Sequence, residues 1–213
     1  MNTSGPVNLW TSSEHVNHYL EHADRISHRT EGEAALLELV PPNARRILDL
    51  GTGDGRLLAL VREHHPSTEA IAVDFSPAML EAARKRFAGD SRVRVSEHNM
   101  DFPLPALGKF DAVISSFAIH HLLHDRKRAL YAEIHDLLNT GGVFCNLEHV
   151  SSPTQRLHEE FLHRIGFTVQ TEDSSNKLLD VETQLGWMRG IGFTDVDCHW
   201  KWRELALLAG VRS

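Results

Sequence analysis

Short apolar runs alternate with segments of helical periodicity through the middle of the chain. The apolar runs at 46–50, 69–74, 92–96, 110–116 and 143–150 have the pattern of strands that are buried on both faces. Apolar residues at helical spacing follow at 56–65, 77–88 and 125–138. Strands that alternate with helices are joined by right-handed crossovers, so residues 43–150 predict a parallel sheet with helices on both faces.

Helical periodicity dominates on both sides of this core. Helices are predicted at 12–26 and 30–40 before it, and at 153–166 and 178–190 after it, the last two joined by the polar segment 172–176. Two further strands, at 192–200 and 204–210, close the chain. Their short connection favours a hairpin, so one of them must run antiparallel to the sheet.

The predicted architecture is therefore a single α/β domain over 1–213. It contains a seven-stranded, mostly parallel, doubly wound sheet with an antiparallel strand in the C-terminal hairpin, and helices on both faces. Its parts are an N-terminal helical lid at 1–42, the core at 43–150, a helical insertion at 151–190 and the closing hairpin at 191–213.

Composition narrows the class of protein only slightly. The 213 residues are 41% hydrophobic and 24% charged, which is ordinary for a globular domain. The net charge of −7 disfavours a broad phosphate-binding surface, so a nucleic-acid partner is not expected. Cys145 and Cys198 have neither metal nor redox spacing, and we interpret them as reduced thiols of a cytoplasmic protein. The sequence shows no signal peptide and no apolar stretch of the roughly 18 residues that span a membrane, and its oligomeric state is open.

The junction between the first strand and its helix carries the strongest chemical signal. Gly51, Gly53 and Gly55 follow the strand directly, and glycine permits positive φ and the close approach of a ligand to the backbone. A phosphate-cradling loop would require a lysine after Gly55, and a dinucleotide fingerprint would require a third glycine at position 56. Arg56 occupies that position, so neither motif is present.

The glycine spacing, with Asp49 two residues before Gly51, resembles the first motif of the class I S-adenosylmethionine-dependent methyltransferases. The resemblance continues in order along the chain, through Asp74 at the end of the second strand, the loop at 99–101, the fourth strand at 110–115 and the turn at 138–144. The closing hairpin resembles the part of that fold that distinguishes it from dehydrogenases.

This resemblance implies S-adenosylmethionine as the cofactor and a set of residues that bind it. The implied cofactor-binding residues are Asp49, Gly51, Thr52, Gly53, Gly55, Asp74, Phe75, Met79, Asn99, Met100, Asp101, Ser115 and Arg25. Asp74 would take both ribose hydroxyls, and either Asn99 or Asp101 would meet the adenine. The positions of these residues along the chain agree with this resemblance, because ligands of open parallel sheets bind beyond the carboxyl ends of the strands. The alternative for Asp74 is a helix-capping acid, which the presence of Ser76 at the cap disfavours.

Methyl transfer is an in-line displacement, so positioning supplies much of the acceleration, and a base is needed only when the acceptor loses a proton. His120, His121 and, more weakly, His149 are the candidate bases because they follow the fourth and fifth strands. The alternative is that they serve loop packing. Together with His124 and Glu148 they lack a recognisable zinc-ligand spacing, so no metal is predicted.

The candidates for contacts on the acceptor side come from the lid, from the segment after the fourth strand and from the insertion. These are Tyr19, Arg29, Phe117 and Trp187. The resemblance also implies that an arginine of the lid pairs with the methionine carboxylate; the alternative is a solvated surface arginine. The apolar spacing of the insertion is equally what two packed helices require.

We therefore expect a methyltransferase that uses S-adenosylmethionine to methylate a small-molecule acceptor at O, N or C. The alternatives are a wobble-uridine tRNA-modifying enzyme with a related cofactor, which would need a basic surface, and a non-catalytic cofactor-binding module. A nicotinamide dehydrogenase is disfavoured by Arg56 and by the terminal hairpin.

Overall fold

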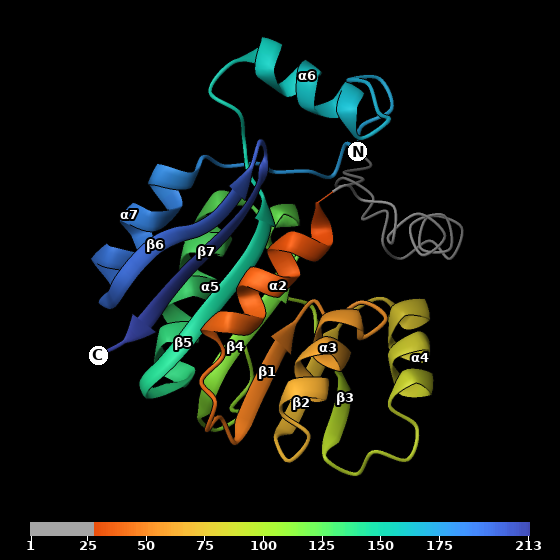
Figure 1. The fold of residues 1–213 in the computed structure, drawn as a ribbon, viewed down its shortest axis with the longest axis vertical. Coiled ribbons are helices and arrows are strands. Elements are labelled where there is room, and N and C mark those ends of the chain that lie inside the picture. Colours follow the sequence, from red (N-terminus) through yellow and green to blue (C-terminus); the bar gives the residue numbers. More distant parts are fainter. Residues whose placement is uncertain (1–27) are drawn as a thin grey trace, which may run out of the picture.

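A seven-stranded sheet in the order β3-β2-β1-β4-β5-β7-β6 forms the centre of the molecule (Figure 1). The computed structural model describes residues 28–213, so the predicted helix at 12–26 lies outside them. The strands are β1 (Arg46–Leu50), β2 (Glu69–Asp74), β3 (Val93–Glu97), β4 (Phe110–Ser116), β5 (Leu138–His149), β6 (Phe193–Trp202) and β7 (Leu205–Arg212). The first five pair in parallel, and β7 runs antiparallel to both β5 and β6. The predicted fold class is confirmed.

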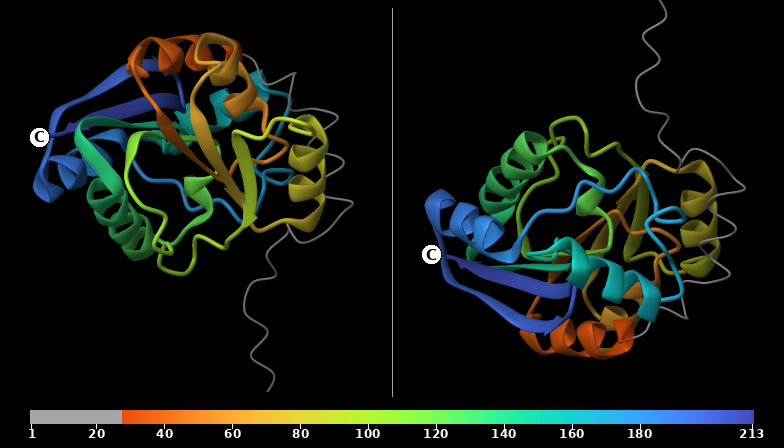
Figure 2. Two further views of the ribbon diagram at one scale, coloured as in Figure 1. Left: turned by 90° about the horizontal axis from the view of Figure 1, so that it is seen from below. Right: turned by 90° about the horizontal axis from the view of Figure 1, so that it is seen from above.

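Helices cover both faces of this sheet. The helices of residues 28–213 are α2 (Arg29–Leu39), α3 (Arg56–His64), α4 (Pro77–Arg86), α5 (His124–Leu137), α6 (Gln155–Arg164) and α7 (Val181–Ile191), with a short 3-10 helix, η3 (Ile119–His121). Helices α2 and α3 lie on one face, and α5 and α7 lie on the other (Figure 2). Helix α4 packs against β2 and β3 at one edge.

The alternation of side chains along the strands explains why both faces are covered. In β1, Leu48 and Leu50 enter the core beneath α5 and α7, while Ile47 enters the core beneath α2 and α3. All three are fully buried, and each contributes about 1.5–3 kcal/mol by leaving water. A strand that is apolar on both faces is stable only between two layers of helices, as the sequence pattern indicates.

Strand β5 begins earlier than its apolar run predicts. Its first residue, Leu138, pairs with Phe110 of β4, and the register then shifts so that Val143 pairs with Ala112. The intervening residues form an irregularity in which Gly141 has a φ of 79°. The predicted turn at 139–142 is thus part of the strand.

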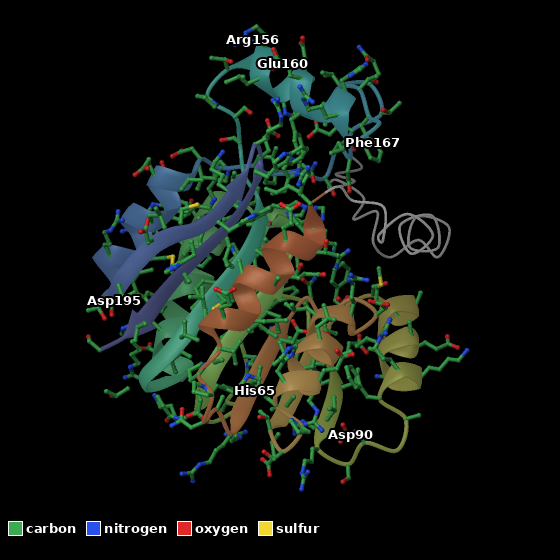
Figure 3. All side chains as sticks on the ribbon, in the orientation of Figure 1. His65, Asp90, Arg156, Glu160, Phe167 and Asp195 are labelled. Carbon is green, nitrogen blue, oxygen red and sulfur yellow. The ribbon has the colours of Figure 1, made fainter. Side chains whose placement is uncertain are left out.

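Helix α6 stands beyond the carboxyl ends of the parallel strands, apart from the two covering layers (Figure 1). Its Phe161 and Leu162 pack against Leu205 at the start of β7 in a small separate core. Arg156 and Glu160 lie on its outer side, and Phe167 follows its C-terminal end (Figure 3). Helix α7 instead packs against α5 and β6. The two helices of the insertion therefore serve different parts of the fold.

Candidate active site

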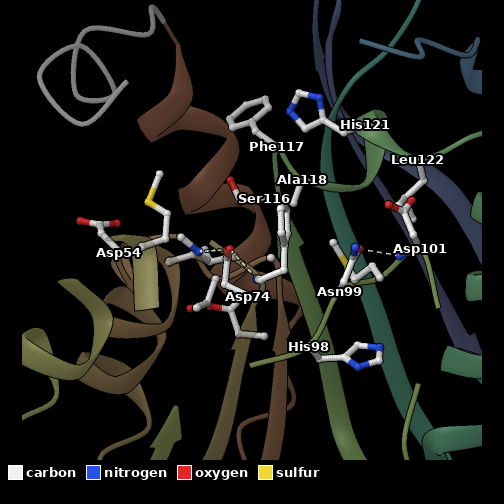
Figure 4. A pocket seen from close by; sticks show the side chains of 18 of the residues that line it. Asp54, Asp74, His98, Asn99, Asp101, Ser116, Phe117, Ala118, His121 and Leu122 are labelled. Atoms are coloured by element: carbon white, nitrogen blue, oxygen red, sulfur yellow. Dashed lines mark hydrogen bonds between the residues drawn. The ribbon is translucent and has the colours of Figure 1, made fainter. Parts of the chain in front are cut away.

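A cavity lies at the carboxyl ends of β1, β2 and β4, where the strand order reverses (Figure 4). Its lining includes most of the predicted site residues: Arg29, Asp49, Gly51, Thr52, Gly53, Asp74, Phe75, Met79, Asn99, Met100, Asp101, Phe117 and His121. Phe117 and His121 lie in the upper part of the view in Figure 4, and Asp74 lies below them. Segments that are far apart in the sequence therefore meet in one site.

Gly51 and Gly53 of the glycine turn are required for two different reasons. Gly51 has a φ of 66°, and a Cβ there would lie 2.2 Å from the Cβ of Ala118, so packing excludes a side chain. Gly53 has a φ of 57°, but the nearest atom to its Cβ position is the Met79 sulfur at 3.8 Å. The space above Gly53 is therefore open, as expected where a ligand approaches the backbone.

Asp49 is a buried residue that stabilises the glycine turn through a hydrogen bond. The hydroxyl of Thr52 donates to Asp49 Oδ2 over 2.6 Å, and the Thr52 amide donates to the carbonyl of Val73 in β2. Burial raises the pKa of Asp49 to about 7, partly offset by the Thr52 hydrogen bond. In β4, the hydroxyl of Ser115 donates to the Leu50 carbonyl at 2.7 Å, so Ser115 stabilises the strand end without lining the cavity.

Asp74 connects the turn to the start of α4. Its Oδ2 accepts from the Gly53 amide at 2.9 Å, and its Oδ1 accepts from the amides of Phe75 and Ser76 at 2.8 and 2.9 Å. Ser76 is the N-cap residue of α4 as predicted, but its side chain makes no capping hydrogen bond, so its presence does not exclude an ordering role for Asp74. Asp74 therefore serves partly as the acid that orders the helix start. A carboxylate has about four acceptor positions, so it retains capacity for a ligand hydroxyl.

The loop at 98–101 forms the neighbouring wall. Asn99 Oδ1 accepts from the Asp101 amide at 2.9 Å, which leaves the Asn99 amide nitrogen for other contacts. Met100 is buried, and its carbonyl accepts from Arg126 at 2.6 Å. His98 also lines the cavity, although the sequence analysis did not single it out. The sequence feature that could have indicated His98 as a site residue is its position directly after β3.

Arg29 lies at the first turn of α2 and is 6% exposed, so the alternative of a solvated surface arginine is wrong. Its Nε donates to Glu33 Oε1 at 2.8 Å, and Glu33 also accepts from Arg56 at 2.9 and 3.0 Å. The Arg29 guanidinium lies 5.6 Å from the ring centre of Phe117. Arg56, which excludes the dinucleotide motif, thus joins the start of α3 to α2.

Phe117 has an unusual backbone for a bulky residue. Its φ is 51°, in the left-handed region, and its amide donates to the Leu147 carbonyl of β5 at 2.8 Å. Such conformations cost on the order of 1–3 kcal/mol and are enriched at functional sites. The conformation places the ring between the cavity and the small core beneath α6.

The three candidate histidines have different surroundings. His121 lines the cavity, and its Nδ1 lies 2.9 Å from the hydroxyl of Ser175 in the insertion. His120 points away, with its Nδ1 2.6 Å from Glu148 Oε1, and His149 Nε2 lies 3.0 Å from Glu204. Burial lowers the pKa of both His120 and His121, so both rings are neutral at pH 7.

Several other predicted residues do not line the cavity. Gly55 is the N-cap of α3, where a Cβ would lie 2.5 Å from the ring of Phe87. Trp187 is half-buried on α7, which packs against α5 and β6. Tyr19 and Arg25 lie outside the described residues.

Residues 28–213 contain neither a candidate metal site nor a candidate membrane span. Within this range, no three His, Cys, Asp or Glu side chains are grouped so that they could hold a metal ion. The helices of the same range include none that is both long and apolar enough to cross a membrane.

The sheet order, the glycine turn and the acid at the end of β2 are the features expected of a Rossmann-like methyltransferase. Residues 47–142 match the family described as "Methyltransferase domain". A demethylmenaquinone methyltransferase from Clavibacter sepedonicus is 30% identical over 175 residues, which cover 75% of this chain and 69% of the relative. The chain belongs to the class I S-adenosylmethionine-dependent methyltransferases, and S-adenosylmethionine is its cofactor.

Further proteins extend the likeness. A demethylmenaquinone methyltransferase from Thermus thermophilus is 34% identical over 65% of this chain and 61% of its own length. A solved O-methyltransferase family protein from Burkholderia thailandensis has a TM-score of 0.75 at 22% identity, covering 96% of this chain. Human N-acetylserotonin methyltransferase, solved with S-adenosylmethionine, has a TM-score of 0.70 at 16% identity over 96% of this chain. The chain spans about three fifths of these two solved chains, namely 61% and 58%, and these structural likenesses show the fold alone.

Proposed function

We propose that this methyltransferase acts on a small-molecule acceptor, at an oxygen, nitrogen or carbon atom. The observation that carries the proposal is the composition of the cavity beyond the glycine turn. Phe117, His121 and Leu122 form an apolar wall with one imidazole, next to the insertion. Such a wall suits a compact acceptor with an apolar body and one polar group.

The cofactor end of the cavity has the groups that S-adenosylmethionine needs. In our proposal Asp74 accepts hydrogen bonds from the ribose hydroxyls, the loop at 99–101 contacts the adenine, and Arg29 pairs with the carboxylate of the methionine portion. Arg29 is the one Arg or Lys among the described lining residues, which include four aspartates. When bound, the cofactor supplies a methyl group on a positively charged sulfur.

His121 is the group that we assign to proton transfer when the acceptor loses a proton on attack. A neutral imidazole can accept a proton, although burial lowers the pKa of His121 and so makes the ring a weaker base, and the contact with Ser175 restrains the orientation of the ring. His120 does not line the cavity, and its contact with Glu148 gives it a role in holding η3.

The relatives suggest where to look for the acceptor. The demethylmenaquinone methyltransferases point to quinone-type aromatic compounds, which match the apolar wall. The decisive experiment measures the release of S-adenosylhomocysteine over a diverse metabolite set that includes such compounds and a tRNA pool. Turnover with a small molecule supports the proposal, whereas turnover with tRNA alone, or none despite cofactor binding, contradicts it. The Gly53→Val variant is the control for background release.

One comparison favours a second candidate. A carboxy-S-adenosyl-L-methionine synthase from Klebsiella pneumoniae is 25% identical over 96% of this chain and 92% of its own length. A protein of this kind would modify the cofactor itself, whereas the tRNA-modification alternative would use a related cofactor to modify tRNA. Mass spectrometry of the cofactor pool after incubation with carboxylate-bearing metabolites distinguishes the two, because only the second candidate yields a carboxylated cofactor.

A further inference from the structure

The polar segment of the insertion contacts the wall that carries His121. Ser175 Oγ lies 2.9 Å from His121 Nδ1, and the Lys177 amide donates to the His120 carbonyl at 2.8 Å. The buried Lys127 of α5 donates to the Lys177 carbonyl at 2.9 Å. The segment at 172–177 thus lies directly behind η3 and is joined to it by specific hydrogen bonds.

A second set of contacts joins this segment to α6 and to the hairpin. His158 of α6 lies between two carboxylates: its Nδ1 is 3.1 Å from both oxygens of Glu204, and its Nε2 is 3.0 Å from Glu172 Oε2. An ionised carboxylate only accepts hydrogen bonds, and a neutral imidazole has only one N–H. Both contacts are therefore satisfied together only when His158 carries two protons and a positive charge.

The surroundings of His158 favour that charged form. Glu204 lies in the turn between β6 and β7 with a fully buried side chain, and it also faces His149 of β5 at 3.0 Å. Glu172 accepts in addition from Asn176 at 3.1 Å. Partial burial lowers the pKa of His158, but the bonds to Glu204 and Glu172 and their charges outweigh it and raise the pKa above its ordinary value.

We propose that Glu204, His158 and Glu172 form a protonation-dependent clamp that holds the segment at 172–177 against η3. Through this clamp, Ser175 is a positioning residue for His121. The role of His121 rests on the proposed methyl transfer, whereas the clamp itself does not. When His158 loses its second ring proton, one of its ring nitrogens still faces a carboxylate but has no N–H to donate. The segment at 172–177 therefore detaches from η3 more often as the pH rises.

The first test measures the titration of His158 by NMR on protein with isotope-labelled histidine, with the signal assigned by its loss in His158→Asn. We expect a pKa above 6.5 in the unmodified protein and a lower one in Glu172→Gln. Glu159→Gln is the matched control, because Glu159 lies on the same helix and faces Gln155 instead. A pKa at or below 6.5 in the unmodified protein, or one unaffected by Glu172→Gln, would overturn the clamp.

The second test follows hydrogen exchange of the segment at 172–177 by mass spectrometry, corrected for the intrinsic pH dependence of exchange. We expect Glu172→Gln to increase exchange roughly tenfold at pH 7, because a charge-assisted hydrogen bond is lost. Raising the pH should do the same in the unmodified protein, which tests the clamp without any substitution. Equal protection from exchange in Glu172→Gln and in the unmodified protein, at both low and high pH, would contradict the clamp.

The third test addresses the positioning of His121. Nitrogen chemical shifts of its ring report which nitrogen carries the proton, and Ser175→Ala should change that distribution while S-adenosylhomocysteine affinity stays within about twofold. An unchanged distribution would refute the positioning role. Because none of these measurements needs an acceptor, failure of the clamp is distinct from failure of the proposed methyl transfer.

Discussion

The two halves of the cavity are built in different ways. The cofactor half consists of backbone turns that directly follow β1, β2 and β3, with Asp74 bonded to the amides of Gly53 and of its own two successors. The acceptor half depends on side chains from distant segments, such as the contact of His121 with Ser175, 54 positions later. The first half follows from local sequence, whereas the second exists only after the chain has folded around it.

The largest effect is expected in the cofactor half. Gly53→Val should lower the affinity for S-adenosylmethionine by more than about 100-fold, because the side chain would fill the open space above the turn. Calorimetric titration measures the loss. Gly89→Val is the matched control: Gly89 has a φ of 87° with no atom within 4 Å of its Cβ position, so it carries the same backbone strain outside the cavity. Equal affinities in the two variants would mean that the ligand does not approach Gly53.

The next largest effect separates the acceptor half from the cofactor half. His121→Ala should slow turnover about 100-fold with any acceptor that loses a proton, while cofactor affinity changes little. Steady-state kinetics with an acceptor from the screen, together with calorimetry, measure both quantities. His64→Ala, an exposed histidine of α3, is the control. Unchanged turnover in His121→Ala would mean that His121 has a packing role and takes no part in proton transfer.

A smaller effect tests what Asp74 does beyond ordering the start of α4. Asp74→Ala should weaken S-adenosylhomocysteine binding by about 1.5–3 kcal/mol, the range for hydrogen bonds to a charged group. Because the variant also loses three backbone contacts, the measurement is paired with a dideoxy analogue that lacks the ribose hydroxyls. The unmodified protein should prefer the hydroxylated ligand and the variant should not. A preference that survives the substitution would exclude ribose contact.

The smallest effect concerns stability in the acceptor half. Since the pKa of His158 is raised in the folded protein, its charged form contributes stability that is fully present below about pH 6.5 and is lost as the pH rises through the folded value. The melting temperature of the unmodified protein should therefore exceed that of His158→Asn at pH 6, and the difference should shrink at pH 9. A difference that is constant or grows with pH would show the opposite sign of the shift.

The cofactor half could be predicted from the sequence because each of its residues lies close to the end of a recognisable strand. Gly53 and Asp74 stand directly after apolar runs, and the carboxyl ends of parallel strands meet at one edge of the sheet. The assignment of the N-cap of α4 to Ser76 was correct, but spacing alone does not reveal that its side chain makes no capping bond or that Asp74 accepts from the Phe75 and Ser76 amides.

The acceptor half was less accessible to sequence reasoning. His158 and Glu204 are 46 positions apart, and no periodicity relates them. The helical spacing around Trp187 correctly indicated a helix, but spacing does not specify that α7 packs against α5. The pairing of Arg56 with Glu33 of α2 was equally invisible, although Arg56 itself was recognised as unusual.

The contact between Gly51 and Ala118 has a consequence for how the two ligands influence each other. The Cα of Gly51 is so close to Ala118, the residue before η3, that even a methyl group does not fit between them. A cofactor that orders the turn therefore also limits the positions open to η3 and to His121. To the extent that a bound cofactor shifts η3, thermodynamic linkage requires each ligand to change the affinity for the other by the same factor. The enzyme should accordingly show cooperative rather than independent binding of methyl donor and acceptor.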